Sequence, residues 1–135
     1  MDTISTKRRS ENMRRIRSKD TKPEIAVRSL VHRLGYRFRL HRDTLPGRPD
    51  LVFPRLRKVI FVHGCFWHQH ANCIDGRMPK SQNSYWIPKL QANIERDKRQ
   101  RKNLGKLGWH VLVVWDCETV NTAKLAMRLR KFLDR

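Results

Sequence analysis

Acidic residues are scarce in this chain of 135 residues, which has 12 Asp and Glu against 31 Lys and Arg and a formal net charge of +19. This charge exceeds what solubility requires and indicates a polyanionic partner. Nucleic acid is the leading candidate, because each phosphate neutralised by Lys or Arg releases counterions. The basic residues form no long amphipathic helix and no lipidation signal accompanies them, so we do not expect the protein to bind a membrane.

Long hydrophobic runs are also missing. No run approaches the roughly 18 apolar residues of a membrane span, and residues 1–20 contain no apolar segment like that of a secretory signal peptide. We therefore expect a cytoplasmic, nucleoid-associated protein with reduced cysteines. Internal repeats and linkers are absent too, and the length suffices for one core but not two. Residues 1–135 are thus expected to form a single domain, with residues 1–20 as a basic N-terminal arm.

Cysteine is limited to three residues, but their placement is informative. Cys65, His70 and Cys73 follow the spacing C-x4-H-x2-C, and Cys117 ends the apolar segment 111–115. Three thiols and an imidazole are the ligands that tetrahedral zinc prefers in closed structural sites. The pattern predicts a structural zinc site that fastens a loop to the sheet. The alternative is that the cysteines are simply small buried hydrophobic residues.

Hydrophobic patterning predicts an α/β fold with the order helix, three strands, helix, strand, helix. Helices are expected after a cap at Thr21, from Ser84 to about Leu107, and after a cap at Asn121. Strands are expected in segments 36–41, 51–53, 59–62 and 109–115. Alternation in the first strand places Arg37, Arg39 and His41 on a basic outer face. The apolar face of the long helix is expected to pack against the core through Ile87, Leu90, Ile94 and Leu104.

The dipeptide Pro49-Asp50 opens a predicted strand and resembles the start of the PD-(D/E)xK nuclease motif. That chemistry needs a carboxylate to hold a divalent cation against the scissile phosphate. A hairpin is expected to bring Asp50 near the end of the next strand, where the motif's second carboxylate is replaced by the segment 61–63, Phe-Val-His. The order of elements indicates a restriction-endonuclease-like core, in which a central mixed sheet is flanked by helices.

Four separate motifs resemble those of the bacterial very-short-patch-repair (Vsr) endonucleases. They are PGRPD at 46–50, HGCFWH at 63–68, NIERD at 93–97 and VWDC at 114–117, and the similarity extends over about residues 7–133. The resemblance implies a magnesium-dependent endonuclease that nicks one DNA strand at a T:G mispair left by 5-methylcytosine deamination, which initiates very short patch repair. It further implies a bacterial monomer that acts on double-stranded DNA, with mismatch-repair proteins as potential partners.

The resemblance also implies ligands for magnesium. Asp50 and the backbone carbonyl of Val62 would bind the cation, and Glu24 would hydrogen-bond metal-bound water. Asp50 could instead be a turn residue at the start of a strand. Glu24 also occupies the capping-box position after Thr21, so a purely structural role remains open for it.

The same resemblance assigns the general base to His68, oriented by Asp97, and places His63 at the phosphate or leaving oxygen. Histidine titrates near neutrality, so it can accept a proton from water, and a carboxylate partner fixes its tautomer. The alternatives are that Asp97 pairs with Arg101 one helical turn away and that His63 and His68 have no catalytic role.

A last set of residues is predicted to contact DNA. The resemblance implies that Phe66, Trp67 and Trp86 intercalate beside the lesion, where unstacking costs less than in a sound duplex. A hydrophobic cluster that shields the zinc is the alternative. The N-terminal arm, with Met13, Arg14 and Ile16, would clamp the duplex. On the long helix, Lys89 and Asn93 would reach base edges near the mismatch.

Two rival functions remain open at this point. One is a related nuclease with a different lesion or site specificity. The other is a catalytically silent, zinc-stapled DNA-binding module, which would bind duplexes without cutting them.

Overall fold

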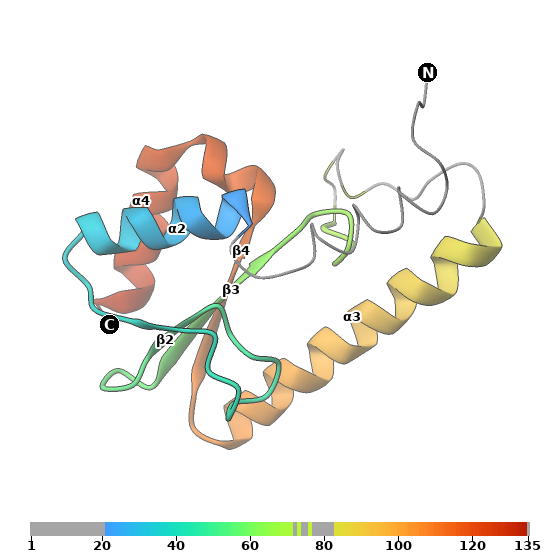
Figure 1. The fold of residues 1–135 in the computed structure, drawn as a ribbon, viewed down its shortest axis with the longest axis horizontal. Coiled ribbons are helices and arrows are strands. Elements are labelled where there is room, and N and C mark those ends of the chain that lie inside the picture. Colours follow the sequence, from blue (N-terminus) through green and yellow to red (C-terminus); the bar gives the residue numbers. More distant parts are fainter. Residues whose placement is uncertain (1–20, 72, 74–75, 77–82, 135) are drawn as a thin grey trace.

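The computed structural model describes residues 21–71, 73, 76 and 83–134, and shows an α/β arrangement around a four-stranded mixed sheet (Figure 1). The strands are in the order β1-β2-β3-β4; neighbours are antiparallel except for the parallel pair β3 and β4. The order of elements agrees with the sequence prediction. The elements are α2 (Lys22–Arg33), β1 (Arg39–Leu40), β2 (Leu51–Phe53), β3 (Lys58–His63), α3 (Asn83–Lys106), β4 (His110–Trp115), the 3₁₀ helix η2 (Asp116–Val120) and α4 (Thr122–Leu133).

The sheet is covered on both faces, and the alternation of side chains along β2 and β3 explains how. Leu51, Phe53 and Ile60 point to one face, where they pack with buried residues of α2 and α4. Val52, Val59 and Phe61 point to the other face, where α3 contributes Leu104. Because strand side chains alternate, two short apolar strands supply both cores. Figure 1 shows α2 and α4 together on one side of the sheet and α3 on the other.

The helix ends follow from local chemistry. The Thr21 hydroxyl accepts a hydrogen bond from the Glu24 amide at 3.4 Å, with Pro23 in the first turn of α2. The Asn121 side chain accepts one from the Lys124 amide at 3.1 Å at the start of α4. Gly108, with φ of +87°, makes the turn from α3 into β4. These caps lie where the sequence predicted them.

Two local predictions were wrong. The strand expected over 36–41 is only two residues long: its pairing with β2 begins at Arg39, and it ends before His41, whose left-handed backbone with φ of +46° leaves the extended conformation. Ile87 was expected inside but is 48% exposed, since the first turns of α3 extend past the sheet (Figure 1). Across the described residues, no helix combines the length and apolar character that crossing a bilayer requires.

The packing of α4 gives a first prediction. Replacing Leu129, which is fully buried, with Ala should lower the free energy of unfolding by about 2–5 kcal/mol, because apolar contacts are lost and a cavity is left in the core. The matched control on the same helix is Met127→Ala, at a side chain that is 73% exposed, where a change within about 0.5 kcal/mol is expected. Urea denaturation followed by circular dichroism measures both values; equal losses would contradict the described orientation of α4.

Candidate active site

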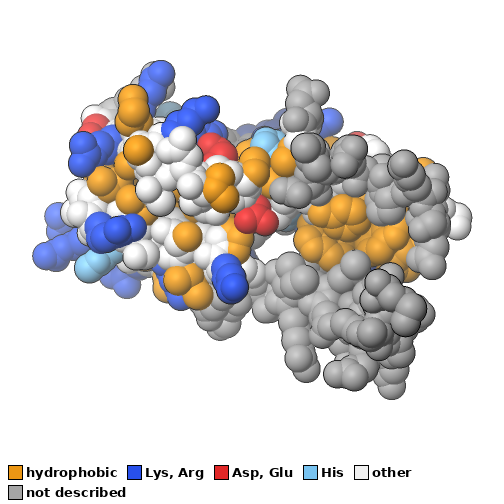
Figure 2. Space-filling view, turned by 90° about the horizontal axis from the view of Figure 1, so that it is seen from above, with side chains coloured by type: hydrophobic (Ala, Val, Ile, Leu, Met, Phe, Trp, Pro, Cys, Tyr) orange, Lys and Arg blue, Asp and Glu red, His pale blue; other side chains and the backbone are white. Residues whose placement is uncertain are grey.

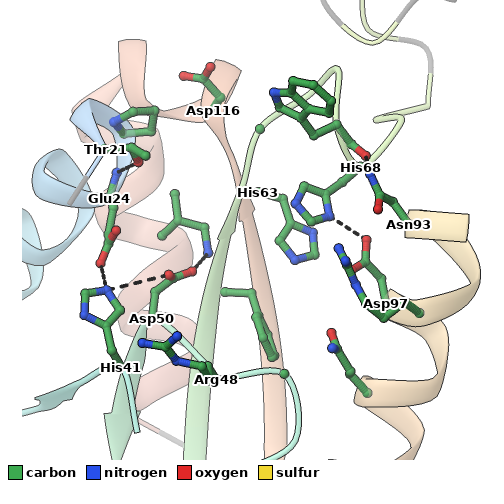
Figure 3. A pocket seen from close by; sticks show the side chains of 18 residues that line it. Thr21, Glu24, His41, Arg48, Asp50, His63, His68, Asn93, Asp97 and Asp116 are labelled. Carbon is green, nitrogen blue, oxygen red and sulfur yellow. Dashed lines mark hydrogen bonds and ion pairs between the residues drawn. The ribbon is translucent and has the colours of Figure 1, made fainter. Parts of the chain in front are cut away.

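A cavity of about 930 Å³ lies at the C-terminal end of β3, between the N-terminus of α2 and the middle of α3. Figure 3 shows two groups of polar side chains on opposite walls of this cavity. The first group, the carboxylate cluster, consists of Glu24, His41 and Asp50. The second consists of His63 and His68, the histidine pair, together with Asp97. Arg48, Asn93 and Arg96 also line the cavity. The predicted catalytic residues are therefore brought together in one place.

The turn at 46–50 carries Asp50 into this cavity. Gly47 has φ of +78°, and a Cβ there would lie 2.8 Å from the Gln100 side chain and 3.1 Å from Phe61. The positive φ favours glycine at this turn, and a larger residue would also have to displace the end of the Gln100 side chain. Asp50 then accepts a hydrogen bond at Oδ2 from the Val62 amide at 2.6 Å, so the predicted proximity of Asp50 to the end of β3 is observed.

The environment of Asp50 opposes ionisation in the protein without a bound cation. Burial raises the pKa of this carboxyl to about 6, and the nearby Glu24 adds to the effect, whereas the Val62 amide and His41 act in the opposite direction. A carboxylate placed in this way gains from a positive charge beside it.

Glu24 faces the cavity from the first turn of α2, where its side chain is only 3% exposed. Its Oε1 is hydrogen-bonded to the Nε2 atom of His41 and lies 3.8 Å from Nη1 of Arg28. The Glu24 carboxylate thus points toward His41, as Figure 3 shows.

His41 is a cavity residue that the sequence analysis placed wrongly on an outer face. Its amide donates to the Asp50 carbonyl at 3.3 Å, which continues the pairing of Leu40 with Leu51 by one step. His41 therefore lies opposite Asp50 in the antiparallel ladder. The pairing register would have revealed this proximity, but alternation along a single strand could not.

The histidine pair forms the opposite wall. The rings of His63 and His68 stack with centroids 3.8 Å apart and an interplanar angle of 7°. His68 donates through Nδ1 to Asp97 Oδ2 at 2.5 Å, which leaves Nε2 as the nitrogen with a free lone pair. Asp97 also lies 3.9 Å from Arg96. The pairing of Asp97 with His68 agrees with the prediction.

The charges of this group are set by burial and by one another. Burial lowers the pKa of His63 to about 3, and the neighbouring His68 contributes in the same direction, so His63 is neutral at physiological pH. Burial also acts to raise the pKa of Asp97, but the hydrogen bond from His68 and the positive charges of His68 and Arg96 outweigh it and leave that pKa below its usual value. Asp97 is therefore an ionised partner for His68.

A third cluster, the cysteine cluster, is connected to the histidine pair through Trp115 and could hold a metal ion. Its ligand atoms all lie within 4.8 Å of one another and belong to Cys65, His70, Cys73 and Cys117. The His70 Nδ1 atom is 3.7 Å from Cys65 Sγ and 3.5 Å from Cys117 Sγ. Burial raises the pKa of Cys65 to about 12 and also raises that of Cys117, so a cation is needed to keep these sulfurs as thiolates.

Trp115 joins the cysteine cluster to the histidine pair, a contact that the sequence did not indicate. Its ring stacks on His70, with centroids 4.2 Å apart, and meets the edge of His63 at 5.3 Å. The parallel register pairs His63 with Trp115 directly. The indole therefore contacts a ring from each site.

The predicted intercalating residues form one aromatic cluster. The ring centroids of Phe66, Trp67 and Trp86 are 5.2–5.8 Å apart, in edge-to-face contacts. Trp67 is only 8% exposed, whereas Phe66 is half-buried, so the two neighbouring rings differ in their access to solvent. Tyr85, which the sequence analysis did not select, extends the cluster through Trp86 at 4.8 Å and is 50% exposed.

Two helical residues predicted to contact bases have different surroundings. Lys89 places its ammonium 5.6 Å from the Trp67 ring centroid, at the edge of the aromatic cluster. Asn93 is 5% exposed and donates from Nδ2 to the Trp67 carbonyl at 3.0 Å, so in this structure it holds the loop that carries His68. The predicted arm residues Met13, Arg14 and Ile16 lie outside the described residues.

The Asn93 contact gives a second prediction. Asn93→Ala should lower the free energy of unfolding by about 1–3 kcal/mol, because it leaves a buried carbonyl without its donor. Gln91→Ala, at an exposed position of the same helix, should change it by less than about 0.5 kcal/mol. Chemical denaturation separates the two, and an Asn93 variant as stable as the Gln91 variant would show that the loop does not depend on this bond.

Comparison with known proteins identifies the family. The family model described as DNA mismatch endonuclease Vsr matches residues 1–74. A type II nicking enzyme of Xanthomonas oryzae pv. oryzae is 55% identical over 133 residues, which cover 98% of this chain and 97% of that protein. The DNA mismatch endonuclease Vsr of Escherichia coli is 44% identical over 117 residues, covering 87% and 74% respectively. A type II nicking enzyme of Neisseria meningitidis is 40% identical over 132 residues, covering 98% and 94%. This chain belongs to the Vsr family of DNA mismatch endonucleases.

Proposed function

We propose that this protein is a DNA endonuclease with a restriction-endonuclease-like core that nicks one strand of a duplex at a T:G mispair. The observation that carries the proposal is the convergence of Asp50 and the His68–Asp97 dyad on one cavity. A carboxylate that holds a cation and an imidazole that accepts a proton are together suited to metal-assisted phosphodiester hydrolysis. Membership of the Vsr family and relatives named as nicking enzymes support the same activity.

The first part of the mechanism concerns the cation. Asp50 and the Val62 carbonyl would hold magnesium, whose charge would stabilise the negative charge that develops on the phosphate in the transition state. The donor set fits a hard cation, because Asp50 and Glu24 provide carboxylate oxygens in the same cluster. With few protein carboxylates at the site, the substrate phosphate would contribute to cation affinity.

The second part concerns proton transfer. Asp97, held as a carboxylate, fixes the Nδ1–H tautomer of His68, so that Nε2 can accept a proton from the attacking water. The carboxylate also stabilises the imidazolium that results. Neutral His63, stacked on His68, would donate a hydrogen bond to the phosphate or the leaving oxygen without adding a second positive charge beside the base.

We further propose that the cysteine cluster holds a structural zinc ion. Bonds of about 2.3 Å to sulfur and 2.0–2.1 Å to nitrogen in a tetrahedral site place neighbouring sulfur and nitrogen atoms about 3.5–3.6 Å apart. The observed separations of His70 Nδ1 from two sulfurs, 3.7 and 3.5 Å, agree with this spacing. Zinc would fasten the loop after β3 to the 3₁₀ helix after β4.

DNA recognition would combine charge with the aromatic cluster. The net charge of +19 supplies sequence-independent attraction to the phosphates. Among the described residues, which Figure 2 shows in colour, hydrophobic side chains form an area at one side of the molecule and most Lys and Arg side chains lie at the other side. Because Phe66 and Trp86 are only half-buried, their rings would be the first to enter the stack at a weakened T:G step, while Trp67 would support them from below.

The proposed activity is tested in the presence of magnesium with linear oligonucleotide duplexes. Each duplex carries a T:G mismatch, another mismatch or only matched pairs. We expect one strand to be cut and only the T:G duplex to be cut efficiently. Asp50→Asn should keep mismatch binding in a gel-shift assay and reduce nicking by at least about 100-fold, because the cation loses a charged ligand. Equal cutting of matched DNA would indicate different specificity, and binding without cutting by the wild type would indicate a silent DNA-binding module.

The proposed zinc site is tested with Cys117→Ser. We expect the variant to contain less than one zinc ion per chain by native mass spectrometry and to melt at a lower temperature, because metal binding contributes to folding. Val120→Ser is the matched control on the same 3₁₀ helix, at a side chain that is 87% exposed, and should retain both zinc and stability. Unchanged zinc content in the Cys117 variant would remove the assignment.

A further inference from the structure

The carboxylate cluster contains one group that the proposed mechanism does not use. His41 places its Nε2 atom between two carboxylates: it is hydrogen-bonded to Glu24 Oε1 and lies 4.0 Å from Asp50 Oδ1. Figure 3 shows the imidazole directed at both acids, on the cavity wall opposite the histidine pair. An imidazole in this position differs from a surface histidine, because only 14% of its side chain is exposed.

We propose that His41 is a third protein ligand of the catalytic cation, which makes this a mixed nitrogen and oxygen site that binds Mn²⁺ more tightly than Mg²⁺. The inference rests on the proposed function, since it concerns the cation at Asp50. It assigns the Nε2 lone pair of His41 and Oδ1 of Asp50 to one ion, together with the Val62 carbonyl, and leaves Glu24 beside the ion as the partner of its bound water.

The spacing of the donor atoms supports this assignment. Octahedral coordination with bonds of about 2.1 Å places adjacent ligand atoms about 3.0 Å apart and opposite ones about 4.2 Å apart. The separation of 4.0 Å between His41 Nε2 and Asp50 Oδ1 is close to that of opposite ligands. One ligand atom from each of Glu24, His41 and Asp50 lies within 4.8 Å of the others, so an ion at Asp50 can reach His41 after small side-chain rotations while Glu24 stays next to it.

The backbone keeps His41 in this position. Its φ of +46° turns the chain at the end of β1, and its amide donates to the carbonyl of Asp50 at 3.3 Å. The two proposed ligands are therefore linked through the main chain as well as through the cluster. Such a link limits how far the imidazole can move away from the carboxylate.

The charges of the cluster point in the same direction. Two carboxylates, one of them almost fully buried, face the imidazole of His41, and Arg28 lies 3.8 Å from Glu24. A dication would match the two negative charges without requiring a charged histidine. Neutral imidazole would then carry its proton on Nδ1 and present Nε2 to the ion.

The preference for manganese follows from the nitrogen ligand. Magnesium favours oxygen ligands and keeps much of its hydration shell, whereas imidazole suits first-row transition metals better. Both ions would occupy the site, but replacing His41 should affect manganese more than magnesium. This difference separates a ligand from a residue that only orients Glu24.

The test uses zinc-loaded protein with a T:G duplex and Mn²⁺ as the probe. Electron spin echo envelope modulation of the frozen complex detects nitrogen bonded directly to Mn²⁺. We expect a ¹⁴N signal in the wild type, its replacement by a ¹⁵N signal in protein labelled with [¹⁵N]histidine, and its loss in both His41→Gln and His41→Asn. His68→Asn, which changes a histidine on the opposite wall, should keep the signal.

Metal competition gives a second measurement. The concentration of Mg²⁺ needed to displace Mn²⁺ should fall by about tenfold or more in His41→Gln, because the nitrogen ligand is lost. Circular dichroism verifies that each variant is folded, and labelling requires no substitution at all. The absence of histidine nitrogen coupling in the wild type, its persistence in both His41 variants, or an unchanged competition ratio would overturn the inference.

The outcomes also separate this inference from the proposed function. If the wild type shows coupling to His41 but fails to nick the T:G duplex, the metal assignment stands and the activity does not. If it nicks in magnesium but shows no nitrogen coupling, the activity stands and His41 only positions Glu24.

Discussion

The parallel pairing of β3 with β4 is the constraint on which the cysteine cluster and the histidine pair depend. Six consecutive pairs, from Lys58 with His110 to His63 with Trp115, fix the register of the two strands. Because parallel strands end at the same edge of a sheet, the segments that follow them lie side by side. Cys65 leaves β3 and Cys117 leaves β4 at this edge, which places their sulfurs around one point. A register shift by one residue would turn His63 away from the cavity and separate the cysteines.

The two walls of the cavity keep similar acids in different states. Asp50 and Asp97 are both shielded from solvent, yet the pKa of Asp50 is raised to about 6 and that of Asp97 is lowered. The difference arises from their partners, since His68 donates directly to Asp97, whereas Asp50 faces Glu24. One acid is thereby committed to an imidazole, and the other gains most from an incoming positive ion. Divergent environments of this kind are a common way to assign separate roles to chemically equal groups.

The sequence predicted the order of helices and strands, because caps at Thr21 and Asn121 and the apolar strands are local signals. It also predicted which residues meet in the cavity, although their catalytic roles stay predictions. The position of His41 was not predictable from alternation, since it depends on one left-handed residue and on the register with β2. The burial of Trp67 was missed for a related reason: its neighbours Trp86 and Asn93 come from α3, far along the chain.

The indole of Trp115 has a consequence for how inhibition by chelators is interpreted. This ring stacks on His70 of the cysteine cluster and makes a T-shaped contact with His63 in the cavity. Removal of the proposed zinc ion would free His70, and the indole of Trp115 with it, to change rotamer beside His63. Under the proposed function, loss of cutting in EDTA would therefore not reveal which of the two proposed metals had been removed. Adding back magnesium alone need not restore activity once the Trp115 ring had shifted.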